Sequence, residues 1–181
     1  PNDPLVNELL AYNYLFLGKI EKGKALLLTA QKTRGKKSFS SSLVAEDYIN
    51  GETSIEGIQA IFSETEESKT SSIEKQASLK KILKDYPNFR AGLLSLALCY
   101  LQRGQEKNAL DPLERLIKID PDNTTALYYL AMIYLNRYDY VRCRLCTNQL
   151  IKHFSKEKPK VLKELVQSLE KVYPTSPSTK L

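Results

Sequence analysis

Residues Arg90 to Asn123 constrain the fold most, because they have the pattern of one complete pair of helices. Their apolar and small side chains recur every three or four residues, which places them on one face of a helix. Gly104 interrupts the first helix, and Pro121 ends the second. Ala97 and Ala109 are small enough to let two helices approach closely where their axes cross. The stretch therefore predicts a helical hairpin.

This hairpin pattern recurs along the chain. Tyr134 lies 34 residues after Tyr100, and Tyr48 lies 34 residues after Tyr14, each in the same local context of apolar and small residues. One hairpin cannot bury its apolar face alone, so stacked hairpins must share a continuous core. The recurrence predicts an all-α solenoid.

The recurring pattern resembles the tetratricopeptide repeat. The resemblance rests on Leu93-x2-Leu96-Ala97-x2-Tyr100, then Ala109-x3-Leu113, then Pro121. Leu93 stands where the family has an aromatic residue and Leu113 where it has phenylalanine, and both positions remain apolar. The resemblance implies a right-handed superhelical solenoid of stacked helical hairpins, with about ten helices and a C-terminal capping helix.

We expect a single domain over residues 1–173. Its predicted parts are clear repeats at about 4–37, 90–123 and 124–157, a degenerate region at 38–89 and a capping helix at 158–172. Residues 174–181 are short and rich in Pro, Ser and Thr, which predicts a flexible tail.

The degenerate region contains one helix too many for the repeat spacing. Tyr100 follows Tyr48 by one repeat plus about one helix with its connector. The unpaired helix is either the one that ends at Tyr86 or the one at residues 40–50. The sequence leaves both alternatives open.

Capping residues mark several predicted helix starts. They are Asp3 before Pro4, capping boxes that begin at Thr53 and Ser71, Asn88 before the central repeat, and Asp122 or Asn123 before the next one. Pro112 falls inside the second helix of the central repeat, where it cannot donate a backbone hydrogen bond. It predicts a kink or a late helix start.

The charge is moderate but unevenly distributed. The net charge is +6, residues 46–67 hold seven acids and no Lys or Arg, and residues 32–37 and 142–163 are mostly basic. Such blocks are most often solvated faces. No apolar run approaches the roughly 18 residues that a membrane span needs. The chain begins at Pro1 without methionine, which is expected of a fragment or processed product that lacks an upstream signal or domain.

The cysteines and the single histidine argue against catalysis. Three cysteines are an odd number, which favours free thiols, a reducing compartment and hence the cytoplasm. Cys143 and Cys146 have the spacing of redox and metal motifs, but no strand precedes them and Cys143 occupies a small packing position. With His153 alone and neither a phosphate loop nor a nucleophile elbow, we expect no enzymatic activity, no cofactor and no metal.

The first helix of each repeat lines the concave surface in the family that this chain resembles. The resemblance therefore implies a protein-binding face at Tyr12, Leu15, Phe16, Leu94, Leu98, Leu101, Tyr128, Met132 and Leu135. Family members that hold the C-terminal carboxylate of heat-shock proteins use lysine, asparagine and arginine on this face, and this chain lacks that set. The apolar composition favours a peptide or amphipathic helix of a protein partner, in a scaffold, adaptor or chaperone-like role.

Three alternatives to an open apolar groove stay possible. The superhelix, the odd helix or a missing flank could bury these residues, or they could form an oligomer contact or an assembly scaffold within a larger protein. The basic clusters could also contact nucleic acid as an accessory domain, although they lack interleaved aromatic residues. Neither a small-molecule substrate nor a membrane span is expected.

Overall fold

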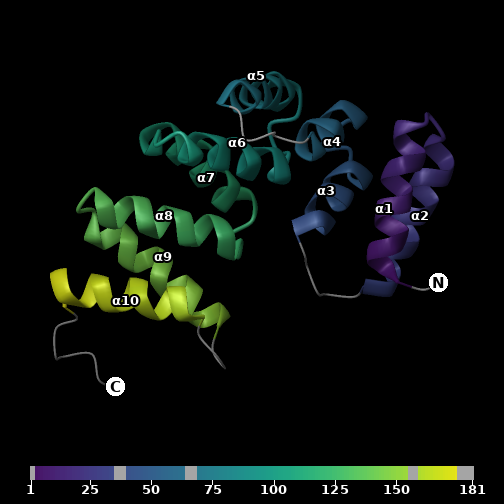
Figure 1. The fold of residues 1–181 in the computed structure, drawn as a ribbon. Coiled ribbons are helices and arrows are strands. Elements are labelled where there is room, and N and C mark those ends of the chain that lie inside the picture. Colours follow the sequence, from purple (N-terminus) through teal and green to yellow (C-terminus); the bar gives the residue numbers. More distant parts are fainter. Residues whose placement is uncertain (1–2, 35–39, 64–68, 155–158, 175–181) are drawn as a thin grey trace. The chain divides into compact units, whose positions relative to one another are not determined.

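The computed structural model describes residues 3–34, 40–63, 69–154 and 159–174, and these residues form ten α-helices without a β-strand (Figure 1). The helices are α1 (Pro4–Phe16), α2 (Ile20–Arg34), α3 (Ser40–Ile49), α4 (Ile55–Phe62), α5 (Lys69–Asp85), α6 (Arg90–Gln102), α7 (Glu106–Ile119), α8 (Thr124–Asn136), α9 (Tyr140–His153) and α10 (Lys160–Val172). The predicted all-α class is confirmed. Residues 175–181 of the predicted tail lie outside the described residues.

The helices belong to two compact units, which are described separately. Unit 1 is Pro1–Arg103 with α1 to α6, and unit 2 is Gly104–Leu181 with α7 to α10. The boundary falls in the turn between α6 and α7, inside the stretch from which the repeat was recognised. A single domain over residues 1–173 stays a prediction.

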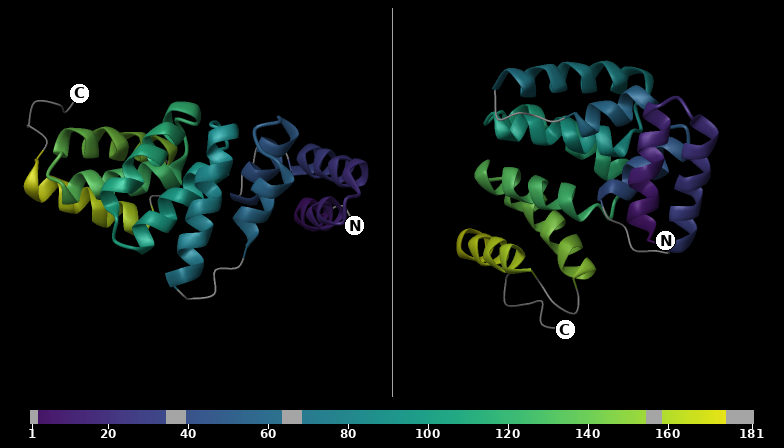
Figure 2. Two further views of the ribbon diagram at one scale, coloured as in Figure 1. Left: turned by 90° about the horizontal axis from the view of Figure 1, so that it is seen from above. Right: turned by 45° about the vertical axis from the view of Figure 1, so that its right-hand side comes forward.

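Unit 1 is built on the antiparallel hairpin of α1 and α2. Helix α3 packs on α2 and α6, while α4 packs on α1, α3, α5 and α6. Helix α5 packs mainly on α6, and both views in Figure 2 show the two side by side. Both helices that were candidates for the unpaired one, α3 and α5, therefore have packing partners within unit 1.

The start of α6 is capped from a distant helix. Its N-cap residue is Phe89, whose side chain forms no capping hydrogen bond, so the predicted cap at Asn88 is wrong. Instead Asp47 of α3 accepts hydrogen bonds from the backbone N–H of Ala91 at 3.2 Å and from Arg90 Nε at 2.7 Å. Glu46 accepts a further one from Arg90 Nη2 at 2.9 Å. These charge-assisted bonds fix α3 against the start of α6.

The other predicted caps have mixed outcomes. Asp3 and Asn123 accept hydrogen bonds from the first turns of α1 and α8, as predicted. Ser54, not Thr53, caps α4, because Ser54 still has an extended backbone (φ −106°, ψ 177°) and the helix begins one residue later than the predicted box requires. Ser71 lies inside α5, so the second capping box is also wrong.

Unit 2 is a consecutive stack in which each helix packs on the next. Helix α7 packs on α8, α8 on α9, and α10 on both α9 and α8. Arg144 of α9 holds the end of α10, because its guanidinium donates to Glu170 at 2.6 Å and to the backbone carbonyl of Tyr173. The buried residues of α10 are Leu162, Leu165 and Leu169, on one face of the helix.

Glycines in the left-handed region end several helices. Gly18, Gly51 and Gly104 have φ values of 72°, 75° and 68°, which L side chains adopt only at a cost. Tyr138 stands 34 residues after Gly104 and has a φ of 61°. The turn between α8 and α9 therefore has the same left-handed backbone conformation as the earlier turns, although it lacks the glycine that favours this conformation.

Pro112 lies inside a helix that begins at Glu106, so the predicted late start is wrong. Proline removes one hydrogen bond of this helix. Leu113 and Leu116 beside it are fully buried, and this packing stabilises the helical backbone. A kink stays a prediction.

Candidate functional site

Two of the predicted binding residues, Leu94 and Leu98 of α6, line an apolar cleft in unit 1. The cleft has a volume of about 230 Å³. Its lining residues come from α3, α4 and α6 and are Leu43, Val44, Ile61, Phe62, Ala91, Leu94, Ser95 and Leu98. None of the eight carries a charge.

The walls of this cleft are partly open to solvent. Leu43, Val44 and Ala91 are buried, whereas Leu94 and Leu98 are half-buried. Phe62 is 41% exposed, and its ring lies 4.9 Å from the ring of Tyr12, measured between centroids. The cleft thus presents apolar area to which a ligand has access.

The N-terminal members of the predicted face lie elsewhere. Tyr12 and Leu15 are in the interior of unit 1, with 4% and 1% exposure, and the Tyr12 hydroxyl donates to Glu8 at 2.7 Å. Phe16 is exposed, and Leu101 is half-buried near the end of α6. None of these four lines the cleft.

The remaining predicted residues are on α8 in unit 2. Tyr128, Met132 and Leu135 are all half-buried, and the ring of Tyr128 lies 5.6 Å from that of Tyr129. The structure therefore brings two of the nine predicted residues, Leu94 and Leu98, into one cleft.

Two models of the tetratricopeptide repeat match the chain, one over residues 91–123 and the other over residues 113–144. Residues 91–144 are thus identified as tetratricopeptide repeats. A search of curated proteins finds no match. Repeats of this family are generally protein–protein interaction modules.

A tetratricopeptide repeat protein from Parabacteroides merdae ATCC 43184 has a similar fold. The two structures align with a TM-score of 0.53 at 16% sequence identity. The alignment covers 93% of this chain and 59% of the Parabacteroides chain. This chain therefore spans less than two thirds of that neighbour, and the similarity bears on the fold alone.

The half of the cleft that precedes the central tetratricopeptide repeat was not predicted from the sequence. Leu43, Val44, Ile61 and Phe62 come from the region treated as degenerate. Their helical spacing was readable, but their position opposite α6 depends on tertiary contacts: α3 is bonded to the start of α6 through Asp47, and α4 packs on α6.

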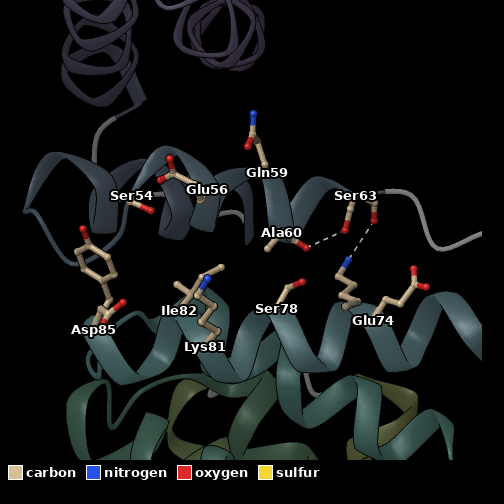
Figure 3. Close-up of a pocket in the computed structure, with 12 residues that line it drawn as sticks. Ser54, Glu56, Gln59, Ala60, Ser63, Glu74, Ser78, Lys81, Ile82 and Asp85 are labelled. Atoms are coloured by element: carbon tan, nitrogen blue, oxygen red, sulfur yellow. Dashed lines mark hydrogen bonds between the residues drawn. The ribbon is translucent and has the colours of Figure 1, made fainter.

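A larger cleft, of about 700 Å³, lies between α4 and α5 of this repeat protein (Figure 3). Small side chains at Ala60 and Ser78 leave it open, and Lys75 Nζ donates to the carbonyl of Ser63 at 3.3 Å. Glu56 lines it, and a hydrogen bond with Ser54 lowers the pKa of Glu56. This carboxyl is ionised at neutral pH and solvated, which does not suit it to act as a general acid.

The two cysteines of the last tetratricopeptide repeat are both buried, which was predicted for Cys143. Burial raises the pKa of Cys143 to about 11, and burial together with Cys143 raises that of Cys146 to about 11. Both thiols are therefore protonated at neutral pH, unlike a redox-active cysteine. Within the described ranges, no three His, Cys, Asp or Glu side chains gather as a metal site.

No helix in the described part of this repeat protein combines the length and the apolar character that crossing a membrane requires.

Proposed function

We propose that the chain is a non-enzymatic protein-binding module whose unit 1 binds an apolar peptide or amphipathic helix in the cleft between α3, α4 and α6. The observation that carries this proposal is the pairing of Leu94 and Leu98 with the exposed ring of Phe62 over a buried apolar floor. A tetratricopeptide repeat supports a protein ligand, and the uncharged lining supports an apolar one.

Burial of apolar side chains of a ligand in the cleft is compatible with micromolar affinity. Each large apolar side chain that a ligand buries contributes roughly 1.5–3 kcal/mol. Two such anchors contribute at most about 6 kcal/mol and three at most about 9 kcal/mol, so a dissociation constant of about 1 μM, at roughly −8 kcal/mol, needs three anchors and small ordering costs of the ligand. A preformed helix meets this condition better than a disordered segment. The module would then act as a scaffold, an adaptor or a chaperone-like protein.

A displayed random-peptide library tests this proposal. Peptides selected on the wild-type protein should be rich in apolar anchors, and fluorescence anisotropy should show their binding abolished by Leu98→Glu. Leu28→Glu is the control for an added carboxylate, because Leu28 is a leucine on α2 that is 43% exposed and lies outside the cleft. Selected peptides without apolar anchors, or equal binding to the Leu98→Glu variant, would refute the proposal.

Circular dichroism separates an open cleft from a buried core. A carboxylate at position 98 of an open wall leaves helical content and melting temperature nearly unchanged, whereas an unpaired carboxylate in a core unfolds the protein. A large loss of stability in Leu98→Glu, but not in Leu28→Glu, would favour the buried core.

A second candidate function is an assembly scaffold, favoured by the surface of α1. This helix exposes large apolar side chains, including Leu5 at 49%, Leu9 at 51% and Leu10 at 43%. Such contiguous exposure is typical of an interaction site. Light scattering coupled to size-exclusion chromatography should then detect an oligomer in the wild type and a monomer in Leu9→Glu.

We also propose a reducing compartment, such as the cytoplasm, for this protein. Cys99, Cys143 and Cys146 are all buried, and none of the three forms a disulfide. Persistence of three titratable thiols in protein isolated under native, non-reducing conditions tests this assignment.

A further inference from the structure

A second apolar cleft lies in unit 2, between α7 and α9 with α8 beneath. Its volume is about 380 Å³. Its lining residues are Glu114, Ile117, Lys118, Leu130, Tyr134, Arg142, Leu145 and Cys146. None of these eight residues belongs to the binding face predicted from the sequence.

The interior of this cleft is apolar and continues onto an exposed stripe of α9. Leu130 and Cys146 form a buried floor, with 3% and 8% exposure. Leu145 at the rim is 61% exposed, and Val141, one turn earlier on the same face, is 60% exposed. Exposed large apolar side chains beside a cleft are typical of an interaction surface.

Two of the polar groups in the cleft, Tyr134 and Glu114, are hydrogen-bonded to each other. The Tyr134 hydroxyl donates to Glu114 Oε1 at 2.7 Å. Burial, together with this hydrogen bond, raises the pKa of Tyr134, so the hydroxyl keeps its proton. An apolar side chain can therefore displace water from the cleft without leaving this donor unpaired.

Two cations flank the apolar floor. Lys118 on α7 is exposed and forms no ion pair with any residue that the structure describes. The guanidinium of Arg142 lies 5.6 Å from the centroid of the Tyr134 ring, and Arg142 is 60% exposed with a long contact of 3.5 Å to Asp139. Both cations can form an ion pair with a carboxylate of a ligand, whereas the Glu114 carboxylate already accepts a hydrogen bond from Tyr134.

We propose that the cleft between α7 and α9 binds an acidic segment of a protein partner. One aliphatic side chain of that segment inserts between Ile117 and Leu145, and a neighbouring carboxylate pairs with Lys118 or Arg142. Charge complementarity selects this partner over a basic segment, because like charges across an interface are repulsive. The site lies within unit 2 and does not depend on the unit 1 cleft.

Synthetic peptides of matched sequence test this proposal. One peptide has a single leucine flanked by aspartate and glutamate, and the other has lysine and arginine at the same positions. In fluorescence anisotropy the acidic peptide should bind at least about tenfold more tightly, and its affinity should fall as salt is added. Equal affinity for the two peptides would overturn the proposal.

Variants locate the binding to the cleft. Leu145→Asp should weaken the acidic peptide by about tenfold or more, and the double variant Lys118→Glu with Arg142→Glu should prefer the basic peptide. The double variant Lys160→Glu with Lys163→Glu is the matched charge control, since both lysines are exposed on α10 and neither lines the cleft. Circular dichroism verifies that the folds are equal, which the exposure of Leu145, Lys118 and Arg142 predicts.

Two further outcomes discriminate between occupants and sites. Leu98→Glu should leave the acidic peptide bound, which separates this site from the one proposed in unit 1. A wild-type dimer in light scattering that Leu145→Asp converts to a monomer would assign the surface to a second copy of the chain and overturn the proposal.

Discussion

Replacing Asp47 by alanine tests how much one long-range contact stabilises the packing of α3 on α6, the helices that supply most of the unit 1 cleft. Asp47 is on α3, which supplies Leu43 and Val44 to the cleft, and it binds the first residues of α6, which supplies Leu94 and Leu98. The change removes the acceptor of the Ala91 N–H and one of the two carboxylates that contact Arg90.

The expected loss of stability follows from these two contacts. Loss of a helix cap costs about 1 kcal/mol. Breaking a buried ion pair by removing one partner costs about 3–5 kcal/mol. Arg90 keeps its contact with Glu46 at 2.9 Å, and the Arg90 side chain is 19% exposed. The cost of removing Asp47 from this pair is therefore at most about 3 kcal/mol, the lower end of that range. We expect Asp47→Ala to lower the free energy of unfolding by about 2–4 kcal/mol.

Urea denaturation followed by circular dichroism measures this change. Glu46→Ala is the matched control, because the Glu46 side chain is 35% exposed and its ion pair contributes about 0–1 kcal/mol. A loss below about 0.5 kcal/mol for Asp47→Ala, or an equal loss for the two variants, would refute the reasoning.

The pH dependence of this site has a defined sign. Burial raises the pKa of Asp47 against the opposing effect of Arg90. The folded protein therefore binds this proton more tightly than the unfolded chain does, so protonation of Asp47 stabilises the fold. This stabilisation is fully present below the pKa of Asp47 in the unfolded chain and is lost as the pH rises through the pKa of Asp47 in the folded protein. The stability of the wild type relative to Asp47→Asn should decrease as the pH rises through that window, and an increase would contradict the raised pKa.

Three further changes test the fold and the thiols. Tyr138→Gly should raise the free energy of unfolding by about 1 kcal/mol, because the left-handed backbone costs residues other than glycine about 1–2 kcal/mol. Gly104→Ala should lower the free energy of unfolding for the same reason. A Tyr138→Gly variant less stable than the wild type would contradict the strain at Tyr138. Ala97→Leu should cost roughly 1–3 kcal/mol by overpacking, since Ala97 is fully buried, and an unchanged melting temperature would contradict the packing. Cys143 and Cys146, with pKa values of about 11, should react slowly with a thiol reagent at neutral pH and faster as the pH rises or the protein unfolds; rapid labelling of the native protein would disagree with their burial.

The repeat, the helices and most turns were predictable because local signals specify them. Apolar spacing of three and four residues predicts a helix wherever it occurs, and Gly18, Gly51 and Gly104 end helices by a conformation that depends on one residue alone. The recurrence of Tyr100 at Tyr134 was sufficient to indicate the family. Burial of Ala97, Ala131 and Cys143 also followed, because the pattern places small residues where helices cross.

The candidate sites were only partly predictable, because exposure depends on contacts between distant helices. Tyr12 and Leu98 have equivalent apolar surroundings in the sequence, yet Tyr12 is buried against Phe62 and Leu98 is half-buried at a cleft wall. In the same way, Leu130 and Tyr134 line the cleft between α7 and α9, although the repeat pattern predicts only that they pack between helices.

The sequence by itself therefore determined the helices and their turns, which depend on residues within about one helical turn of each other, and the repeat class, which follows from the recurrence of this local pattern after 34 residues. The tertiary structure decided which apolar side chains stay accessible and how α6 begins. Its start is stabilised by Asp47, 44 residues earlier than Ala91, and no local pattern encodes a hydrogen bond over that separation.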